Sequence, residues 1–458
     1  MKNKKRRLIT SILVLAIVLT VLAPTAVPAA AAAKKATRAQ VITQLWKLAG
    51  SPTFTGDIGF SDVKAKDSYS AAFRWAYRTG VLKKAKAIKP KSAATRQWIV
   101  TTFYSYSGKP DTSALSAGFK DESKIAKKSK ATVIPAMRWA YANDLMKGIC
   151  KKNLSPKSGV TAKQLKTIAK NYKEKAAKEP IAVSVLDTEC APSGLTLAED
   201  GSLVVTDTWN KKIWRVIAGK AKLVAGADSV IGMDDAPVGG YNDGDADKAL
   251  FKECFAVVPF IGGWAVSDTN NGAIRIIKNG QVTYLTKSIE TPTGLTTDPE
   301  GNLYVADRDK GEIRVVNVTD EKVKITTLIS DLNEPMGIVY HNGSIYVAES
   351  GANRIVSVSI ADKKLTVVAG SGEEDMTDGA AASATFASPV ALAITSSGVI
   401  YVADYANGAI RMIKSETVST LISDVDSEII AGPMGLAVCG KRLYYADNFL
   451  KKVYSIAI

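Results

Sequence analysis

Histidine is almost absent from this chain, since its 458 residues contain only one, His341. A zinc site built from several histidines is therefore excluded, and a nucleophilic triad would have to use that single imidazole. Cysteine is also scarce, with four residues, so the chain is not a disulfide scaffold. Cys190 and Cys254 stand at the starts of neighbouring repeats, and they either pair or remain buried free thiols.

Long apolar runs are missing beyond residue 33. The chain opens with MKNKKRR, which holds five basic residues and no acidic ones. LITSILVLAIVLTVL follows, too short to span a bilayer comfortably, and then the small residues of APTAVPAAAAA. This order predicts a secretory signal peptide over residues 1–33, with an uncleaved anchor helix as the alternative. We therefore expect a secreted protein with no membrane span after cleavage.

Charge divides the rest of the chain into two parts. Residues 34–180 hold 31 Lys/Arg and 9 Asp/Glu, a net charge of +22, whereas residues 181–458 hold 24 and 35, a net charge of −11. A basic module favours an anionic partner. The lysines are scattered and no arginine-aromatic motif is present, so we expect an envelope polysaccharide and no nucleic acid. The predicted organisation is a helical domain over 34–172, a linker over 173–180 and a second domain over 181–458.

The basic part repeats two phrases. One begins at Thr37, Thr95 and Thr161, each followed by Gln and then by apolar residues at helical spacing. Thr is a good helix N-cap, and a Gln in the first turn can complete a capping box. The other phrase, R-W-A-Y, places Trp75 and Trp139 64 residues apart. These phrases predict short helices in a repeat of roughly sixty residues.

The same phrases resemble the S-layer homology domain, whose unit reads F-S-D-V, then a helix ending in W-A and Gly, then T-R-A-E. Two units follow that order after an orphan T-R-A-Q helix, at Phe60, Ser61, Asp62, Trp75, Gly80, Thr95 and Arg96, and at Phe119, Asp121, Trp139, Gly148 and Thr161. Ala162 stands where the third motif has its Arg. The resemblance implies binding to an anionic, often pyruvylated, polysaccharide linked to peptidoglycan, at the surface or S-layer of a bacterial cell wall.

The resemblance also implies which residues bind the polysaccharide. They are Arg38, Arg96, Trp75 and Trp139, with Ser61 and Asp62 of the F-S-D-V motif. A guanidinium suits carboxylate ligands, and an aromatic face suits a sugar ring. The alternative for the tryptophans is a place in the core, because they sit at helical spacing among apolar residues.

The acidic part holds six copies of another phrase, starting at Pro192, Phe255, Pro292, Pro335, Pro389 and Pro433. Each copy contains short β-rich runs split by turn signals, and most are followed by a further strand. Four antiparallel strands every forty or more residues predict a propeller blade. The last copy stops after its third strand, and residues 181–187 supply the missing one, which closes a ring of six without a free edge.

The phrases P-x-G-L, L-Y-V-A-D and D-x-x-N-x-x-I resemble the NHL repeat. The equivalent acids are Asp207, Asp268, Asp307, Glu349, Asp404 and Asp447. We expect each to bond to backbone N–H groups two residues on, at the turn after the second strand. Six acids spaced around a ring cannot serve one site, so we interpret them as structural, including those in the two phrases that contain NGAIR.

No catalytic residue or metal ligand emerges from these patterns. The acids of NDGDAD (residues 242–247) are followed by Lys248 and Cys254 where an EF-hand needs Gly and Glu, so we interpret the segment as a repeat turn, with calcium as the alternative. The expected fold is a small all-α domain followed by a six-bladed propeller. We expect a wall-anchored protein that presents the propeller to a ligand or protein. The alternative is an extracellular lyase or lactone hydrolase with a metal in the channel.

Overall fold

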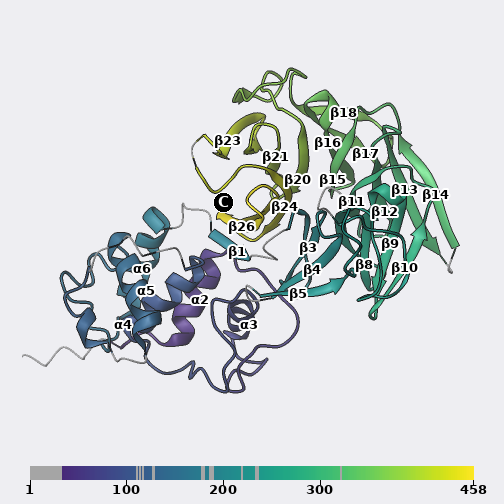
Figure 1. Cartoon of the computed structure of the whole chain (residues 1–458). Coiled ribbons are helices and arrows are strands. Elements are labelled where there is room, and N and C mark those ends of the chain that lie inside the picture. The colour runs from purple at the N-terminus through teal and green to yellow at the C-terminus, as the bar shows by residue number, and fades with distance from the viewer. Residues whose placement is uncertain are drawn as a thin grey trace, which may run out of the picture.

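A helical region precedes six antiparallel sheets in the computed structural model (Figure 1), as the sequence predicts. Residues 1–33, which hold the predicted signal peptide, lie outside the described residues. The structure describes residues 34–458 except 110–111, 113–114, 116–117, 126–128, 177–180, 185–189, 218–219, 233–236, 320–321 and 426. No helix in these ranges combines the length and hydropathy needed to cross a bilayer.

The described part of the helical region contains five α-helices and two short helical turns. They are α2 (Arg38–Leu48), α3 (Ser70–Arg78), α4 (Arg96–Tyr106), η1 (Glu122–Lys124), α5 (Lys130–Ala142), α6 (Ala162–Asn171) and η3 (Tyr172–Ala176). The expected threonine caps are present. Thr37 and Thr161 form capping boxes with Gln40 and Gln164, and the Thr95 hydroxyl accepts a hydrogen bond from a backbone N–H of α4. The caps explain why α2, α4 and α6 begin where they do.

The three capped helix starts meet at one place in the fold. The Ala36 N–H donates to the Val160 carbonyl (2.7 Å), and the Ala94 N–H donates to the Ala36 carbonyl (2.9 Å). The Arg96 N–H donates to the Ser158 carbonyl (2.7 Å). The repeats therefore share their backbone hydrogen bonds in a three-way junction around a single hydrophobic core.

The propeller has the predicted six blades of antiparallel strands. Blade 1 comprises β2 (Pro192–Leu197), β3 (Leu203–Asp207), β4 (Lys212–Ile217) and β5 (Lys220–Ala225). Blade 2 comprises β7 (Cys254–Phe260), β8 (Gly263–Asp268), β9 (Ala273–Lys278) and β10 (Gln281–Thr286). Blade 3 comprises β11 (Pro292–Thr297), β12 (Leu303–Asp307), β13 (Glu312–Thr319) and β14 (Lys322–Ile329). Blades 4 and 5 comprise β15 (Pro335–His341), β16 (Ser344–Glu349), β17 (Arg354–Ser359) and β18 (Leu365–Ala369); and β20 (Pro389–Ile394), β21 (Ile400–Asp404), β22 (Ala409–Lys414) and β23 (Thr417–Ser423). Blades 2 and 5 gain a short outer strand each, β6 (Gly244–Asp245) and β19 (Gly379–Ala380).

Blade 6 closes the ring with a strand from the other end of the repeats. It comprises β24 (Pro433–Cys439), β25 (Arg442–Asp447), β26 (Lys452–Ala457) and β1 (Ile181–Ser184). β1 pairs antiparallel with β26, with Ile181 opposite Ser455. The predicted closure is confirmed for residues 181–184, because this outer strand precedes blade 1 in the chain and leaves β26 with no free edge.

The glycine of the P-x-G phrase lets neighbouring inner strands approach closely. A Cβ atom added at Gly194, Gly294, Gly337 or Gly435 would collide with a backbone carbonyl oxygen of the next blade. The innermost strands therefore pack backbone against backbone around the ring, as the glycine permits.

The helical region packs directly on blades 1 and 6 (Figure 1). Arg78 forms an ion pair with Asp200 in the β2–β3 hairpin (3.0 Å). The Lys441 N–H, in the β24–β25 hairpin, donates to the Ala49 carbonyl (2.9 Å). Arg442 donates to the Tyr106 carbonyl at the end of α4 (3.3 Å). All these contacts lie at the hairpin ends of the blades.

Candidate functional site

The six repeat acids are buried and bond to the backbone of their own blades. All are at most 1% exposed. Each accepts a hydrogen bond from an N–H group 16 or 17 residues earlier, in the loop that enters the blade. In blades 1 and 6 a second bond comes from the residue three positions on, rather than two, as with Asn210 and Asp207 (3.1 Å). The carboxylates therefore tie each incoming loop to the end of the second strand, and in blades 1, 2, 5 and 6 also to the turn that follows it.

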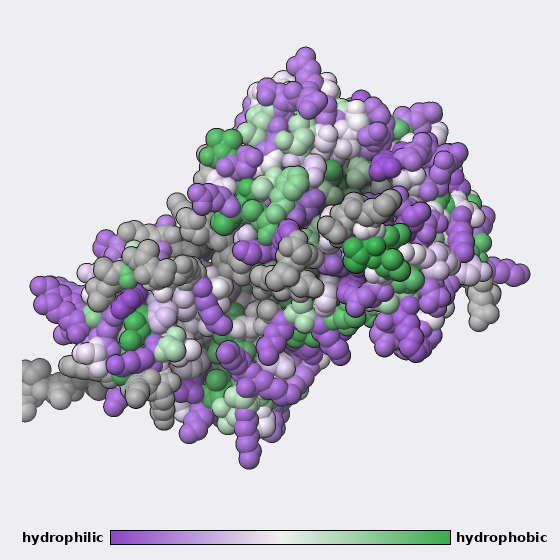
Figure 2. Space-filling model, viewed as in Figure 1, coloured by the Kyte–Doolittle hydropathy of each residue, from purple (hydrophilic) through white to green (hydrophobic). Residues whose placement is uncertain are grey.

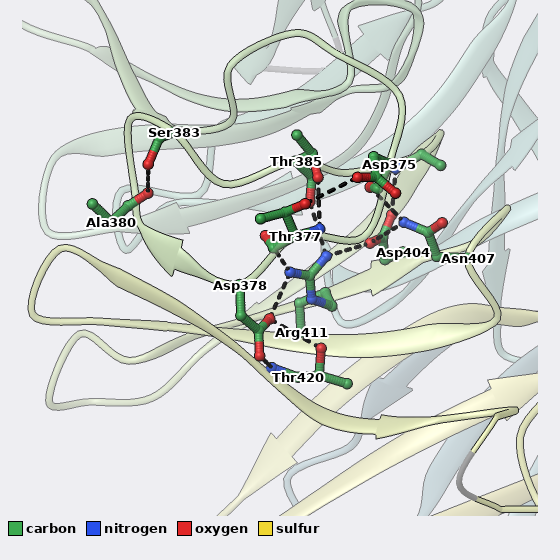
Figure 3. A network of polar contacts seen from close by, with 11 residues as sticks. Asp375, Thr377, Asp378, Ala380, Ser383, Thr385, Asp404, Asn407, Arg411 and Thr420 are labelled. Atoms are coloured by element: carbon green, nitrogen blue, oxygen red, sulfur yellow. Dashed lines mark hydrogen bonds and ion pairs between the residues drawn. The ribbon is translucent and has the colours of Figure 1, made fainter.

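The arginines of the two NGAIR phrases hold separate segments of the propeller together, a role that sequence reasoning missed. Arg275 and Arg411 are fully buried. Arg411 pairs with the repeat acid Asp404 (2.9 Å) and with Asp378 (2.7 Å) in the long segment before blade 5 (Figure 3). It also donates to the Thr385 carbonyl (2.9 Å). The arginine thus fastens the long segment to its blade.

Blade 2 repeats this arrangement with Arg275. The guanidinium pairs with Asp268 (2.9 Å) and, through Nε, bonds to Asp243 (3.0 Å) in the long segment before the blade. It also donates to the Leu250 carbonyl (3.0 Å) and lies over the Phe251 ring. A signal was present in the sequence, because NGAIR occurs in the two copies that follow long segments with D-G and A-x-F.

Asp404 illustrates how hydrogen bonds and an ion pair offset the burial of a repeat acid. Burial raises the pKa of Asp404, while hydrogen bonds from Asn407, the Ala387 N–H and Arg411 act in the opposite direction. A buried carboxylate is tolerated when it is paired and hydrogen-bonded. The duplicated phrase therefore encodes a duplicated buried ion cluster.

The NDGDAD segment already uses its acids within the protein. Asp243 binds Arg275, and Asp245 pairs with Lys248 (2.8 Å) and accepts from Gln281 (2.8 Å). Within the described residues, no group of three or more His, Cys, Asp or Glu side chains is arranged to hold a metal. The interpretation of the segment as a turn is correct only in part, because Gly244–Asp245 form the short strand β6 and pair with β10.

The four cysteines are free thiols. Cys190 donates to the Lys451 carbonyl (3.2 Å) and Cys254 to the Asp207 carbonyl (3.3 Å). Burial raises the pKa of Cys254 well above its usual range. Of the two alternatives for this pair, the structure shows buried thiols.

The central channel is lined mostly by apolar residues of the inner strands, with Thr196 and Thr296 among the polar ones. The lining includes the residue at one equivalent position of each inner strand, namely Leu195, Val257, Leu295, Ile338, Leu392 and Leu436. The channel encloses about 300 Å³, and the described residues that line it include no carboxylate, imidazole or thiol. His341 lies at the end of β15, half-buried beside Asn342 and the Tyr346 ring. These surroundings do not bring acid–base groups together in the channel.

In the helical region, Arg38, Ser61 and Asp62 converge on one loop. Arg38 donates to the Ile88 carbonyl (2.7 Å), and Asp62 accepts from the N–H groups of Ile88 (2.9 Å) and Lys89 (2.7 Å). Ser61 donates to the Lys86 carbonyl. The predicted arginine, serine and acid therefore hold the shape of loop 86–89.

The second repeat builds an equivalent loop. Arg96 donates to the Leu154 carbonyl (3.1 Å), and Asp121 accepts from the N–H groups of Leu154 (2.9 Å) and Ser155 (2.8 Å). Beside this loop lies a cavity of about 530 Å³, lined in part by Thr95, Gln97, Asp121, Ser129, Ser155, Pro156, Lys157 and Ser158.

Both loops continue into the same three letters, P-K-S, which sequence reasoning missed. Lys91 and Lys157 are exposed there. The Ser92 and Ser158 carbonyls accept hydrogen bonds from the first N–H groups of α2 and α4. Each repeat therefore places an exposed lysine beside the N-terminus of a helix.

The two tryptophans predicted to bind sugar are buried instead. Trp75 and Trp139 are 3% and 4% exposed. Trp75 packs against Tyr106 (5.6 Å between ring centroids), and Trp139 packs against Tyr104 (5.7 Å). Neither ring presents a face to solvent, so their positions match the core alternative.

Blades 1 and 6 share a turn that differs from the other four. After the repeat acid, each carries an exposed aromatic, Trp209 or Phe449. Each also has a lysine with positive φ, Lys211 (59°) and Lys451 (56°), where the other blades have Gly or Asn. These turns lie at the ends of the strands opposite the hairpins that contact the helical region. The turn face over blades 1 and 6 therefore points away from that region.

Comparisons with known proteins agree with the repeat structure. A family model described as "Repeat of unknown function (DUF6923)" matches residues 255–424. The chain is 29% identical over 171 residues to NHL repeat-containing protein 2 of Homo sapiens, covering 31% of this chain and 24% of that protein. It is 27% identical over 167 residues to Protein SUPPRESSOR OF QUENCHING 1, chloroplastic, of Arabidopsis thaliana, covering 32% and 15%. The chain thus spans less than a quarter of either relative's length.

Solved structures with similar architecture include virginiamycin B lyase from Staphylococcus aureus, at 15% identity and a TM-score of 0.44 over 61% of this chain and 98% of that one. An auxiliary nutrient binding protein from Bacteroides thetaiotaomicron aligns at 15% identity and a TM-score of 0.45, over 58% and 69%. The blade topology and the NHL relative together define the class: the chain carries a six-bladed NHL-like β-propeller behind an N-terminal helical region.

Proposed function

We propose that this protein is secreted, is held at a bacterial cell surface by an anionic wall polysaccharide bound to its helical region, and presents the propeller to a ligand or protein. The observation that carries the proposal is the pair of equivalent loops. Each is held by the arginine and acid of its own repeat, and each exposes a lysine beside a helix N-terminus.

Charge supports an anionic partner. The helical half carries a net charge of +22, and hydrophilic side chains cover much of it in Figure 2. Such a surface attracts a polyanion over a distance set by ionic strength. Helix N-termini add a partial positive charge.

The cavity beside the second loop offers the chemistry that an acidic sugar needs. Hydroxyl and amide groups of Thr95, Gln97, Ser129 and Ser158 can exchange hydrogen bonds with sugar hydroxyls. Lys157 supplies a charge for a carboxylate or ketal-carboxylate. The site therefore uses loop side chains rather than the buried tryptophans.

In this arrangement the turn face of the propeller points away from the helical region and therefore away from the cell wall. The helical region covers the hairpin ends of blades 1 and 6, which leaves the turn face with Trp209 and Phe449 uncovered. Exposed aromatic side chains on rigid turns are frequent anchors of binding interfaces. The channel lining includes no described carboxylate, imidazole or thiol that would favour the alternative of an enzyme with a channel metal.

Sedimentation with purified wall sacculi tests the proposal. The mature chain should pellet with intact sacculi and remain soluble with sacculi stripped of their secondary polysaccharide. A Lys91→Glu/Lys157→Glu variant should bind at least tenfold more weakly, whereas Lys278→Glu/Lys414→Glu, with the same charge change on the propeller, should bind nearly as wild type. Equal pelleting with intact and stripped sacculi, or equal binding by the two double variants, would refute the assignment.

A further inference from the structure

A second cavity lies where the helical region meets blade 6. It encloses about 350 Å³, and we call it the junction cavity. The helical region contributes Tyr106, Tyr172 and Lys173, and the propeller contributes Lys441 and Arg442. It belongs neither to the polysaccharide loops nor to the central channel, and its residues have no part in the proposed function.

Arg442 is a buried cation that forms no ion pair with any described residue. It is 7% exposed, and within the described residues no carboxylate lies within ion-pair distance of it. Its guanidinium donates to the Ser455 hydroxyl (2.8 Å) and to the Tyr106 carbonyl (3.3 Å). A buried charge is ordinarily compensated by an opposite charge. The contrast with Arg275 and Arg411, which hold two acids each, is clear.

Neutral groups offset only part of this charge. The Tyr106 ring centroid lies 4.7 Å from the guanidinium carbon, close enough for a cation–π contact. The Tyr106 carbonyl is at the C-terminus of α4, where the helix dipole is equivalent to roughly half a negative charge. Burial raises the pKa of Tyr172, and the nearby Arg442 acts in the opposite direction, so the Tyr172 hydroxyl faces the same cation.

Two lysines add further positive charge to the same walls. Lys173 and Lys441 are exposed at the rim, and no described acid pairs with either. Arg442, Lys173 and Lys441 thus surround one open space, and no described acidic side chain lines it. The electrostatic potential inside such a cavity is positive, and cavities with low-dielectric walls concentrate counter-ions.

We propose that the junction cavity binds a small anion with a phosphate or carboxylate group, held by Arg442, Lys173 and Lys441. A guanidinium matches both groups with two parallel hydrogen bonds, and lysines add point charges. Because Lys173 belongs to the helical region and the other two to blade 6, the bound anion joins the two parts of the chain. It therefore stabilises their contact by mass action.

Calorimetric titration of the mature chain with sodium phosphate and with sodium acetate, at constant ionic strength set with chloride, tests this. Saturable binding of either anion is expected. Lys173→Gln/Lys441→Gln should weaken it at least tenfold, and Lys278→Gln/Lys414→Gln, which removes the same charge from exposed ends of β9 and β22, should leave it within twofold. Absence of saturable binding by wild type, or equal affinity in both double variants, overturns the proposal.

The anion could be free or carried on a polymer, and a competition arm separates these sources. If soluble wall polysaccharide displaces phosphate from wild type, and the same polysaccharide with esterified acidic groups does not, the natural anion is a group carried on the polymer. No displacement identifies a free anion. Arg442→Gln should abolish binding, and its thermal unfolding should be checked, while the lysine variants keep the test independent of that result.

Discussion

Arg411→Met tests the buried ion cluster that explains the duplicated NGAIR phrase. The substitution keeps an unbranched apolar side chain and removes a guanidinium that is fully buried between Asp404 and Asp378. It also removes the bond to the Thr385 carbonyl. Breaking a buried pair by removing one partner costs about 3–5 kcal/mol, because the other charge stays buried and uncompensated. We expect a loss of that size in the free energy of unfolding.

Arg314→Met is the matched control for this prediction. Arg314 occupies the equivalent position of blade 3, opposite Val305 as Arg411 is opposite Val402. It pairs with Glu312 on its own strand (2.6 Å), and both side chains are 22% exposed. A partly exposed pair contributes about 0–1 kcal/mol. Removing Arg314 should therefore change stability little.

Urea unfolding of the mature chain, followed by the strand signal in circular dichroism, measures the difference. Arg411→Met should unfold at a clearly lower urea concentration than Arg314→Met, and its segment 370–388 should become sensitive to protease. If the two variants lose the same free energy within about 0.5 kcal/mol, the cluster does not hold the segment and the reasoning fails.

Three further predictions follow from the fold. Gly435→Ala should destabilise the propeller by about 1–3 kcal/mol in thermal unfolding, because its Cβ would collide with the Ser193 carbonyl; an unchanged melting temperature would contradict this. Burial alone would raise the pKa of Asp200, but hydrogen bonds from Ser202 and Arg215 hold it below 3.8. The folded pKa is thus depressed, so its stabilisation is present above about pH 4 and disappears as pH falls through the folded value. Asp200→Asn should flatten that part of the stability–pH profile between pH 2 and 6, and an unaltered profile would refute the assignment. Thiol titration should find four reactive thiols in denatured protein under non-reducing conditions, since all four cysteines are free; two would indicate a disulfide.

The repeat architecture was predictable because its signals are local and periodic. Alternating apolar runs and turn residues recur in six copies, and the P-x-G glycine recurs in four of them. The closing strand β1 was predictable from an incomplete end and an extra start. Likewise, Thr37 and Thr161 cap their helices through residues three positions away.

The ion clusters were harder to predict because their partners are distant in sequence. Arg411 meets Thr385 and Asp378 26 and 33 residues earlier, in a long loop without periodicity. The burial of the two tryptophans could not be predicted from the sequence either. The spacing of Trp75 and Trp139 fits either a core or a groove, and the packing of Tyr104 and Tyr106 against them decides between the two.

The junction cavity illustrates a further limit. Lys173 lies at the end of the helical region, and Lys441 and Arg442 lie near the end of the propeller. The two sides of the cavity are therefore more than 260 positions apart in the sequence. Nothing in either stretch marks it as half of a site. The contact appears only when ring closure brings blade 6 back to the helical region.

The most direct test of the account is the heat of binding of purified, acidic wall polysaccharide to the mature chain. We predict saturable binding that weakens as salt is raised and falls at least tenfold in Lys91→Glu/Lys157→Glu. Absence of binding, or binding equal to that of neutral dextran, would contradict the claim that the helical region anchors this protein to an anionic polysaccharide.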